Sequence, residues 1–201
     1  MSPTSSPPPQ AGLWPYTGKA TNTGSGQGRG ATINIPLPGG AGDAAMRAAF
    51  LRIVEPAARR FAPDAILVSA GYDAHALDPL AAMQLHVGTY YWMSSRLAAL
   101  ARQLCGGRLL LVLEGGYHLA SLAESVTASA RGLVGLQHVW TASTQFGPPL
   151  INANNYGGAA GSTGRAEAGP GGDEAVPSYC REEPTEKVEQ VLQQVASLHG
   201  L

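Results

Sequence analysis

The chain has 201 residues, of which 44% are hydrophobic and 13% charged, so it is long enough for one domain with a sizeable core. Its formal net charge of −1 gives no general attraction to nucleic acid or anionic lipid, and we expect neither as a direct partner. No apolar run approaches the roughly 20 residues of a membrane-spanning helix. The two cysteines, Cys105 and Cys180, form neither a thiolate zinc motif nor a disulfide framework, so the reducing interior of a cell is the default expectation for the compartment.

The N-terminal part of the chain contains little periodic sequence. Residues 1–13 are rich in Ser and Pro, and we interpret them as a disordered leader. Residues 32–37 alternate apolar and polar side chains, which predicts a short strand. Pro36 has no N–H to donate, so this strand is expected at a sheet edge or at a strand end.

The first predicted helix covers residues 44–61. Asp43 precedes it and is the expected N-cap. Pro56 should kink this helix or begin a second helical piece, because proline cannot donate to the preceding turn. Four apolar residues at helical spacing should form its inward face: Met46, Phe50, Ile53 and Val54.

The middle of the chain reads as strand, helix, strand, helix. Residues 65–70 and 108–113 are short continuous apolar runs, which are typical of strands buried on both faces of a parallel sheet. Residues 87–104 and 119–133 carry apolar side chains at helical spacing. This order predicts an α/β fold with parallel strands, covering helices and a right-handed crossover.

The C-terminal part divides into two segments. Residues 141–181 are rich in Gly and Ala without periodicity, which predicts a flexible insertion. Residues 182–201 should contain a helix that docks on the domain through one apolar stripe. The stripe comprises Val188, Val191, Leu192, Val195 and Leu198.

Two loops that follow the predicted strands carry the residues best suited to chemistry. Asp73 lies in the first loop and Tyr117 in the second. Ligand sites of parallel α/β sheets lie beyond the carboxyl ends of the strands, so both side chains could face one crevice. On pattern alone, a single aspartate after a strand is more often a cap or turn former, and a tyrosine after Gly-Gly can be a packed loop aromatic.

Three segments, in this order, resemble the histone deacetylase family. Residues 24–43 contain the glycine-rich run G-S-G-Q-G-R-G, then N-I-P-L-P and Gly-Asp. Residues 69–80 read S-A-G-Y-D-A-H-A-L-D-P-L, and residues 113–117 read L-E-G-G-Y. The resemblance covers roughly residues 14–136. It implies that residues 14–140 are the C-terminal part of a class II-like deacetylase domain, a partial three-layer α/β/α arginase/deacetylase-type fold with parallel strands.

The resemblance also implies roles for the matching residues. Asp73 corresponds to the family's second zinc-binding aspartate, and Zn²⁺ is the implied cofactor. Tyr117 corresponds to the tyrosine whose hydroxyl binds the substrate carbonyl and its developing oxyanion, a donor that can contribute several kcal/mol to catalysis. Gly115 and Gly116 would let the backbone line the acyl-lysine channel closely.

The matching segment contains two further polar residues, Asp78 and His75, whereas other catalytic residues of the family have no counterpart in this chain. We interpret Asp78 as a loop-ordering residue, since it precedes Pro79, and His75 as a structural residue behind the metal ligands. In the family the other two zinc ligands come from an earlier D-x-H motif, and an adjacent His-His pair carries out the acid–base chemistry. Its single D-x-H sequence, Asp73-Ala74-His75, lies within the segment already matched, and no D-x-H motif precedes it in this chain. Its five histidines are all isolated from one another: His75, His86, His118, His138 and His199.

Three interpretations follow. The chain could be the incomplete catalytic unit of a zinc-dependent deacetylase, acting on an acetylated protein or a small acyl amide and completed by a missing N-terminal half. It could be a partner-binding remnant of the deacetylase fold, or an inactive truncated product. A hydrolytic zinc usually needs three protein ligands, so we expect this chain alone to be inactive. Its compartment could be the nucleus, the cytoplasm or an organelle.

Overall fold

The computed structural model describes residues 17–137 and 182–201. The predicted leader, 1–13, and the predicted insertion, 141–181, lie outside these residues. The chain divides into two compact units, one drawn from Met1–Pro63 and Glu183–Leu201 and the other from Asp64–Glu182. None of the helices in the described part of the chain is both long enough and apolar enough to cross a membrane.

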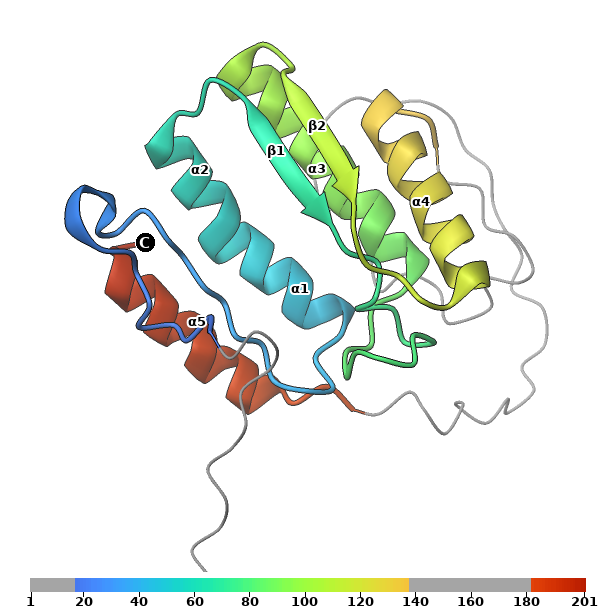
Figure 1. Cartoon of the computed structure of the whole chain (residues 1–201), viewed down its shortest axis with the longest axis horizontal. Coiled ribbons are helices and arrows are strands. Elements are labelled where there is room, and N and C mark those ends of the chain that lie inside the picture. Colours follow the sequence, from blue (N-terminus) through green and yellow to red (C-terminus); the bar gives the residue numbers. More distant parts are fainter. Residues whose placement is uncertain (1–16, 138–181) are drawn as a thin grey trace, which may run out of the picture. The chain divides into compact units, whose positions relative to one another are not determined.

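The unit drawn from Asp64–Glu182 contains the predicted order of strands and helices. Strand β1 (Ile66–Ala70) leads to helix α3 (Val87–Cys105), and strand β2 (Leu109–Leu113) leads to helix α4 (Leu119–Val134). The two strands pair in parallel, from Ile66 opposite Leu109 to Ala70 opposite Leu113, and they lie side by side in Figure 1. The α/β fold class and the parallel pairing are therefore confirmed, and each predicted boundary lies within one residue of the observed one.

The expectation that both strands are buried on both faces is wrong for the described residues. Helix α3 lies behind the strands in Figure 1 and contacts β2, so it covers one face of the sheet. On the opposite face, Leu67, Leu110 and Val112 are 72%, 56% and 48% exposed. The apolar composition of these runs is typical of strands with helices packed on both faces of the sheet. In this unit, helix α3 packs on one face and the other face is exposed.

Helices α3 and α4 pack closely because small residues line their contact. The most buried residues of α4 are Ser121, Ser125, Ala128, Ser129 and Gly132. A Cβ on Gly132 would lie 2.6 Å from the carbonyl oxygen of Tyr91 in α3, so this position requires glycine. From the apolar spacing of residues 119–133 we expect Leu122, Val126 and Leu133 to face inward, but they are only half-buried. The helix ends at Gly135, whose φ of 74° fits a glycine cap.

The other unit is mainly helical. Its elements are the short 3-10 turn η1 (Gly26–Gly28), helix α1 (Asp43–Ala49), the π turn η2 (Phe50–Val54), helix α2 (Glu55–Phe61) and the C-terminal helix α5 (Thr185–His199). Pro56 lies in the first turn of α2, which confirms that it begins a second helical piece. Phe50 and Ile53 are buried as predicted, whereas Met46 is half-buried and Val54 is 36% exposed.

Two local predictions in this unit are wrong. Residues 32–37 form no strand, and the Asn34 side chain instead donates hydrogen bonds to the carbonyls of Lys19 and Asn22, at 3.1 and 2.9 Å. Asp43 is the first residue of α1, and Gly42 occupies the N-cap position without a capping side chain. The Glu183 carboxylate takes the capping role, because its two oxygens accept from the backbone N–H groups of Ala44 and Ala45, each at 3.0 Å.

Helix α5 packs along α1 and η2 (Figure 1). Three members of its predicted stripe, Val188, Leu192 and Val195, are buried. Outside this stripe, Arg52 holds the Glu189 carboxylate with both terminal nitrogens, at 2.6 and 3.0 Å. The hydrogen bonds from Arg52 lower the pKa of Glu189. The apolar stripe and the ion pair together fix one face of α5 on this unit.

Candidate functional site

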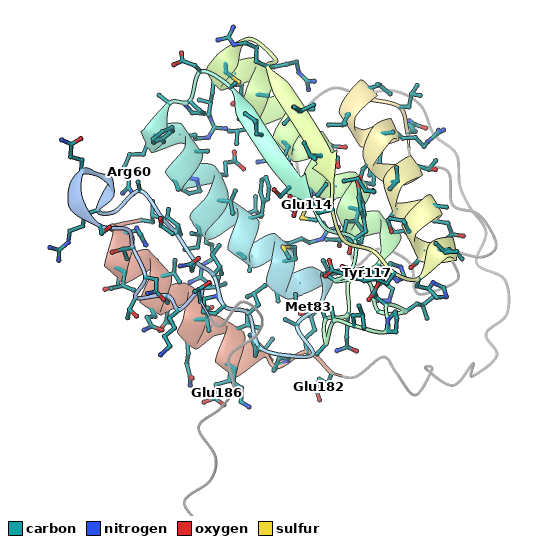
Figure 2. The ribbon with its side chains drawn as sticks, viewed as in Figure 1. Arg60, Met83, Glu114, Tyr117, Glu182 and Glu186 are labelled. Atoms are coloured by element: carbon teal, nitrogen blue, oxygen red, sulfur yellow. The ribbon has the colours of Figure 1, made fainter. Side chains whose placement is uncertain are left out.

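The two motif loops meet at the carboxyl ends of β1 and β2. The amide of Glu114 donates to the carbonyl of Ala70 at 3.1 Å, which extends the strand pairing by one step. The amide of Tyr72 then donates to the carbonyl of Gly115 at 2.9 Å. Figure 2 labels Glu114 and Tyr117 in the segment that leads from β2 towards α4. The structure therefore brings together the two loops that the sequence singled out.

The Asp73 carboxylate lies against the backbone of both loops. A Cβ on Gly71 or on Gly115 would lie 2.8 Å from Oδ1 of Asp73, which is closer than real side chains approach. Asp73 is half-buried, and no group in the described residues donates a hydrogen bond to its carboxylate. The two glycines thus make room for a carboxylate whose oxygens are still available to a ligand.

This close approach predicts the effect of Gly115→Ala. The new methyl group would also lie 2.9 Å from Cγ of Asp73, so the carboxylate must move. We expect a changed Cγ chemical shift for Asp73 in carbon-detected NMR spectra, with little loss of stability because a side-chain end can yield. Gly28→Ala is the matched control, since nothing lies within 4 Å of its added Cβ. An unchanged Asp73 signal in Gly115→Ala would contradict the prediction.

Tyr117 presents its side chain to solvent. The residue is 55% exposed, and it follows Gly116, whose φ of 130° is a conformation that favours glycine. A Cβ on Gly116 would also meet Leu122 Cδ1 at 2.8 Å and Tyr72 Cβ at 3.0 Å. Gly116 is therefore required both by its backbone conformation and by its surroundings. The exposed Tyr117 hydroxyl can serve as a hydrogen-bond donor to a ligand.

The Asp78 carboxylate joins the first loop to the second. Asp78 is only 8% exposed. Its Oδ1 accepts from the backbone N–H of Leu80 at 2.9 Å, and its Oδ2 accepts from the backbone N–H of Tyr117 at 2.7 Å. The first bond orders the turn around Pro79, as expected for a loop-ordering residue, and the second reaches the other loop.

His75 is packed inside the first loop. It is 3% exposed, and its Nδ1 accepts from the backbone N–H of Leu77 at 3.1 Å. Its ring stacks with that of Tyr90, with centroids 6.5 Å apart and an interplanar angle of 11°. The backbone beside it forms a bridge with Leu85. These contacts support the structural interpretation of His75.

The described residues do not fit a zinc site by themselves. In residues 17–137 and 182–201, no group of three or more His, Cys, Asp or Glu side chains lies close enough together to hold a metal ion. Asp73 offers one carboxylate, whereas a hydrolytic zinc site takes three protein ligands. Further ligands would have to come from polypeptide outside these residues.

Sequence reasoning missed two supports of the loops. The Tyr90 hydroxyl donates to the carbonyl of Tyr72 at 3.2 Å, and the two rings lie 5.0 Å apart, so α3 supports the residue next to Asp73. His118 caps α4, because its Nδ1 accepts from the backbone N–H of Ser121 at 3.3 Å. Because a helix was predicted to start directly after His118, the sequence could have identified His118 as its N-cap. Helical spacing alone does not reveal the contact between Tyr90 and Tyr72.

Comparison with known proteins identifies the family. Residues 8–133 match the model of the histone deacetylase domain. The chain belongs to the histone deacetylase family. Its relatives within the family include "Histone deacetylase 10, chloroplastic" of Oryza sativa subsp. japonica and "Histone deacetylase 14, chloroplastic" of Arabidopsis thaliana. Each is 42% identical to it over 192 residues, or 96% of this chain.

Solved structures show the same relationship for the fold. The crystal structure of the HDA15 HD domain matches 94% of this chain with a TM-score of 0.63 and 28% identity. The histone deacetylase Clr3 matches 92% of it with a TM-score of 0.64 and 29% identity. The arginase/deacetylase-type fold is therefore confirmed. The chain spans less than half of these proteins: 36% and 38% of the two chloroplastic relatives and 41% of the HDA15 domain.

Proposed function

We propose that this chain supplies one part of the active site of a zinc-dependent deacetylase, which hydrolyses acetyl-lysine or a related acyl amide. The observation that carries the proposal is the direct joining of the two loops that hold Asp73 and Tyr117. Asp73 provides a carboxylate with no competing hydrogen-bond donor in the described residues, which suits a metal ligand. Membership of the histone deacetylase family supports the same chemistry.

Tyr117 is proposed as the oxyanion donor. Hydrolysis of an amide passes through a tetrahedral state in which negative charge develops on the former carbonyl oxygen. The Tyr117 hydroxyl would donate a hydrogen bond to that oxygen, and the bond would strengthen as the charge grows. Gly115 and Gly116 would form the wall of the acyl channel, where the absence of side chains leaves space for the substrate.

The remainder of the site is proposed to come from another part of the deacetylase domain. The described residues contain neither the further zinc ligands nor a pair of adjacent histidines that could exchange protons with substrate. The missing half would belong either to a longer chain or to a separate polypeptide. Alone, this chain is expected to bind zinc weakly and to have no turnover.

A partner-binding remnant is the second candidate, and the open sheet face favours it. Leu67, Leu110 and Val112 form an exposed apolar surface on two adjacent strands. Such surfaces mark interaction sites more often than isolated exposed apolar residues do. A remnant would use this surface without any need for Asp73 or Tyr117 to contact substrate.

The names of the relatives leave more than one substrate class for the proposal. Some are called histone deacetylases, and one, 43% identical over 126 residues, is called "Polyamine deacetylase HDAC10" of Homo sapiens. The proposed substrates are accordingly acetylated proteins or small acyl amides. Both classes carry an amide carbonyl to which Tyr117 would donate in the proposed reaction.

A chimera tests the proposed function. The matching segment of the chloroplastic rice relative is replaced by this chain, and zinc content and hydrolysis of an acetyl-lysine peptide and of an acetylated polyamine are measured. We expect about one zinc per chimera and turnover of at least one substrate, whereas the isolated chain shows neither. Asp73→Asn should abolish both properties, and Asp64→Asn, an exposed aspartate of the same unit, should not. An inactive chimera beside an active rice protein would contradict the proposal.

A further inference from the structure

We propose that Asp78 is a positioning residue that sets where the Tyr117 hydroxyl lies relative to the Asp73 carboxylate. This inference rests on the proposed function for its catalytic consequence, although the contact itself does not. The observation is the hydrogen bond from the Tyr117 backbone N–H to Asp78 Oδ2, at 2.7 Å, across 39 positions of sequence.

The bond is strong because one partner is charged. An ionised carboxylate that accepts from a backbone N–H makes a shorter and stronger bond than two neutral groups do. Asp78 is 8% exposed, so little water competes for its oxygens. The Tyr117 N–H also lies just before the first turn of α4, where the helix dipole favours a negative charge.

The two oxygens of Asp78 have separate tasks. Oδ1 accepts from Leu80 at 2.9 Å and fixes the turn within the first loop, which would suffice for a residue that only orders its own turn. Oδ2 is directed to the second loop and holds the backbone from which the Tyr117 side chain extends. Asp78 thus fixes Tyr117 to the loop that carries Asp73.

The other links between the loops do not hold Tyr117 itself. The amide of Tyr72 donates to the carbonyl of Gly115, two residues before Tyr117. Gly116 then follows with a φ of 130°, a backbone conformation that glycine adopts readily and other residues rarely do. Without Asp78, Tyr117 would follow this glycine with no contact to the first loop among the hydrogen bonds of the described residues. A displacement of about 1 Å at a reacting group can cost about 10²-fold in rate.

The contact is tested first in the 201-residue chain by amide hydrogen exchange followed by NMR. We expect the Tyr117 amide to exchange at least about 10-fold more slowly than its unprotected rate, and Asp78→Ala to remove this protection. Asp64→Ala is the matched control and should leave the protection unchanged. An unprotected Tyr117 amide in the unsubstituted chain would overturn the proposal, even if Asp78→Ala fails to fold.

The catalytic consequence is tested in the chimera. Asp78→Ala should lower kcat by about 10²-fold while zinc content stays at the unsubstituted level and KM changes little. An unchanged kcat in a folded, zinc-loaded Asp78→Ala chimera would show that Asp78 has a structural role alone and would overturn the positioning role. If the unsubstituted chimera has no turnover, the proposed function fails, and the exchange result still decides whether Asp78 holds Tyr117.

Discussion

Tyr117→Phe in the chimera is expected to lower kcat by about 10²- to 10³-fold, because loss of one oxyanion donor removes roughly 3–4 kcal/mol of transition-state stabilisation. Phenylalanine keeps the ring and removes only the hydroxyl. Since Tyr117 is 55% exposed, its side chain contributes little to the core, and the melting temperature should not change. Zinc content should also stay constant, because the hydroxyl is not a proposed metal ligand.

Tyr91→Phe provides the matched control for this experiment. It removes the hydroxyl that donates to the carbonyl of Leu136 at 3.1 Å, which belongs to the contact between α3 and the end of α4. Turnover should be unaffected by this change. A Tyr117→Phe chimera with the turnover of the unsubstituted one would exclude Tyr117 as the oxyanion donor.

The second large effect concerns stability. Leu192→Ala should destabilise the unit that contains α5 by about 2–5 kcal/mol, the usual cost of removing a fully buried leucine side chain. Leu192 is 0% exposed and lies between Val188 and Val195 on the buried stripe of α5. The effect is measured as the change in urea midpoint, followed by a probe in α1.

Leu198→Ala is the control on the same helix. Leu198 is 45% exposed, so its truncation leaves a smaller cavity and should cost much less. If Leu192→Ala and Leu198→Ala shift the midpoint equally, helix α5 is not packed as described. The ratio of the two effects therefore tests the docking of α5 directly.

The elements of the fold could be predicted because their signals are local. The apolar runs before Asp73 and before Tyr117 predicted both strands, and helical spacing predicted α3, α4 and α5. Residues 32–37 were predicted wrongly as a strand because alternation says nothing about a pairing partner. Asn34 supplies a different set of contacts there, with Lys19 and Asn22.

The contacts between distant residues could not be predicted from the same signals. Glu183 caps α1 across 139 and 138 positions, and a side chain so far away leaves no pattern near Asp43, which was the local choice for the cap. The same holds for the bond between Asp78 and Tyr117, of which the sequence showed only the Asp-Pro turn. Asp73 and Tyr117 were singled out by their place after the two strands, and the family resemblance supplied the roles proposed for them.

The capping of α1 by Glu183 has a consequence for biosynthesis. A ribosome synthesises α1 and its flanking residues long before it reaches Glu183. Until then, the backbone N–H groups of Ala44 and Ala45 cannot donate to the Glu183 carboxylate. During that interval the face of α1 and η2 that later receives α5 has no cover from α5. The unit drawn from Asp64–Glu182 has all of its residues earlier and can fold first. The helical unit is therefore the last to be completed during synthesis, and its surface on α1 and η2 lacks α5 until the C-terminal residues emerge.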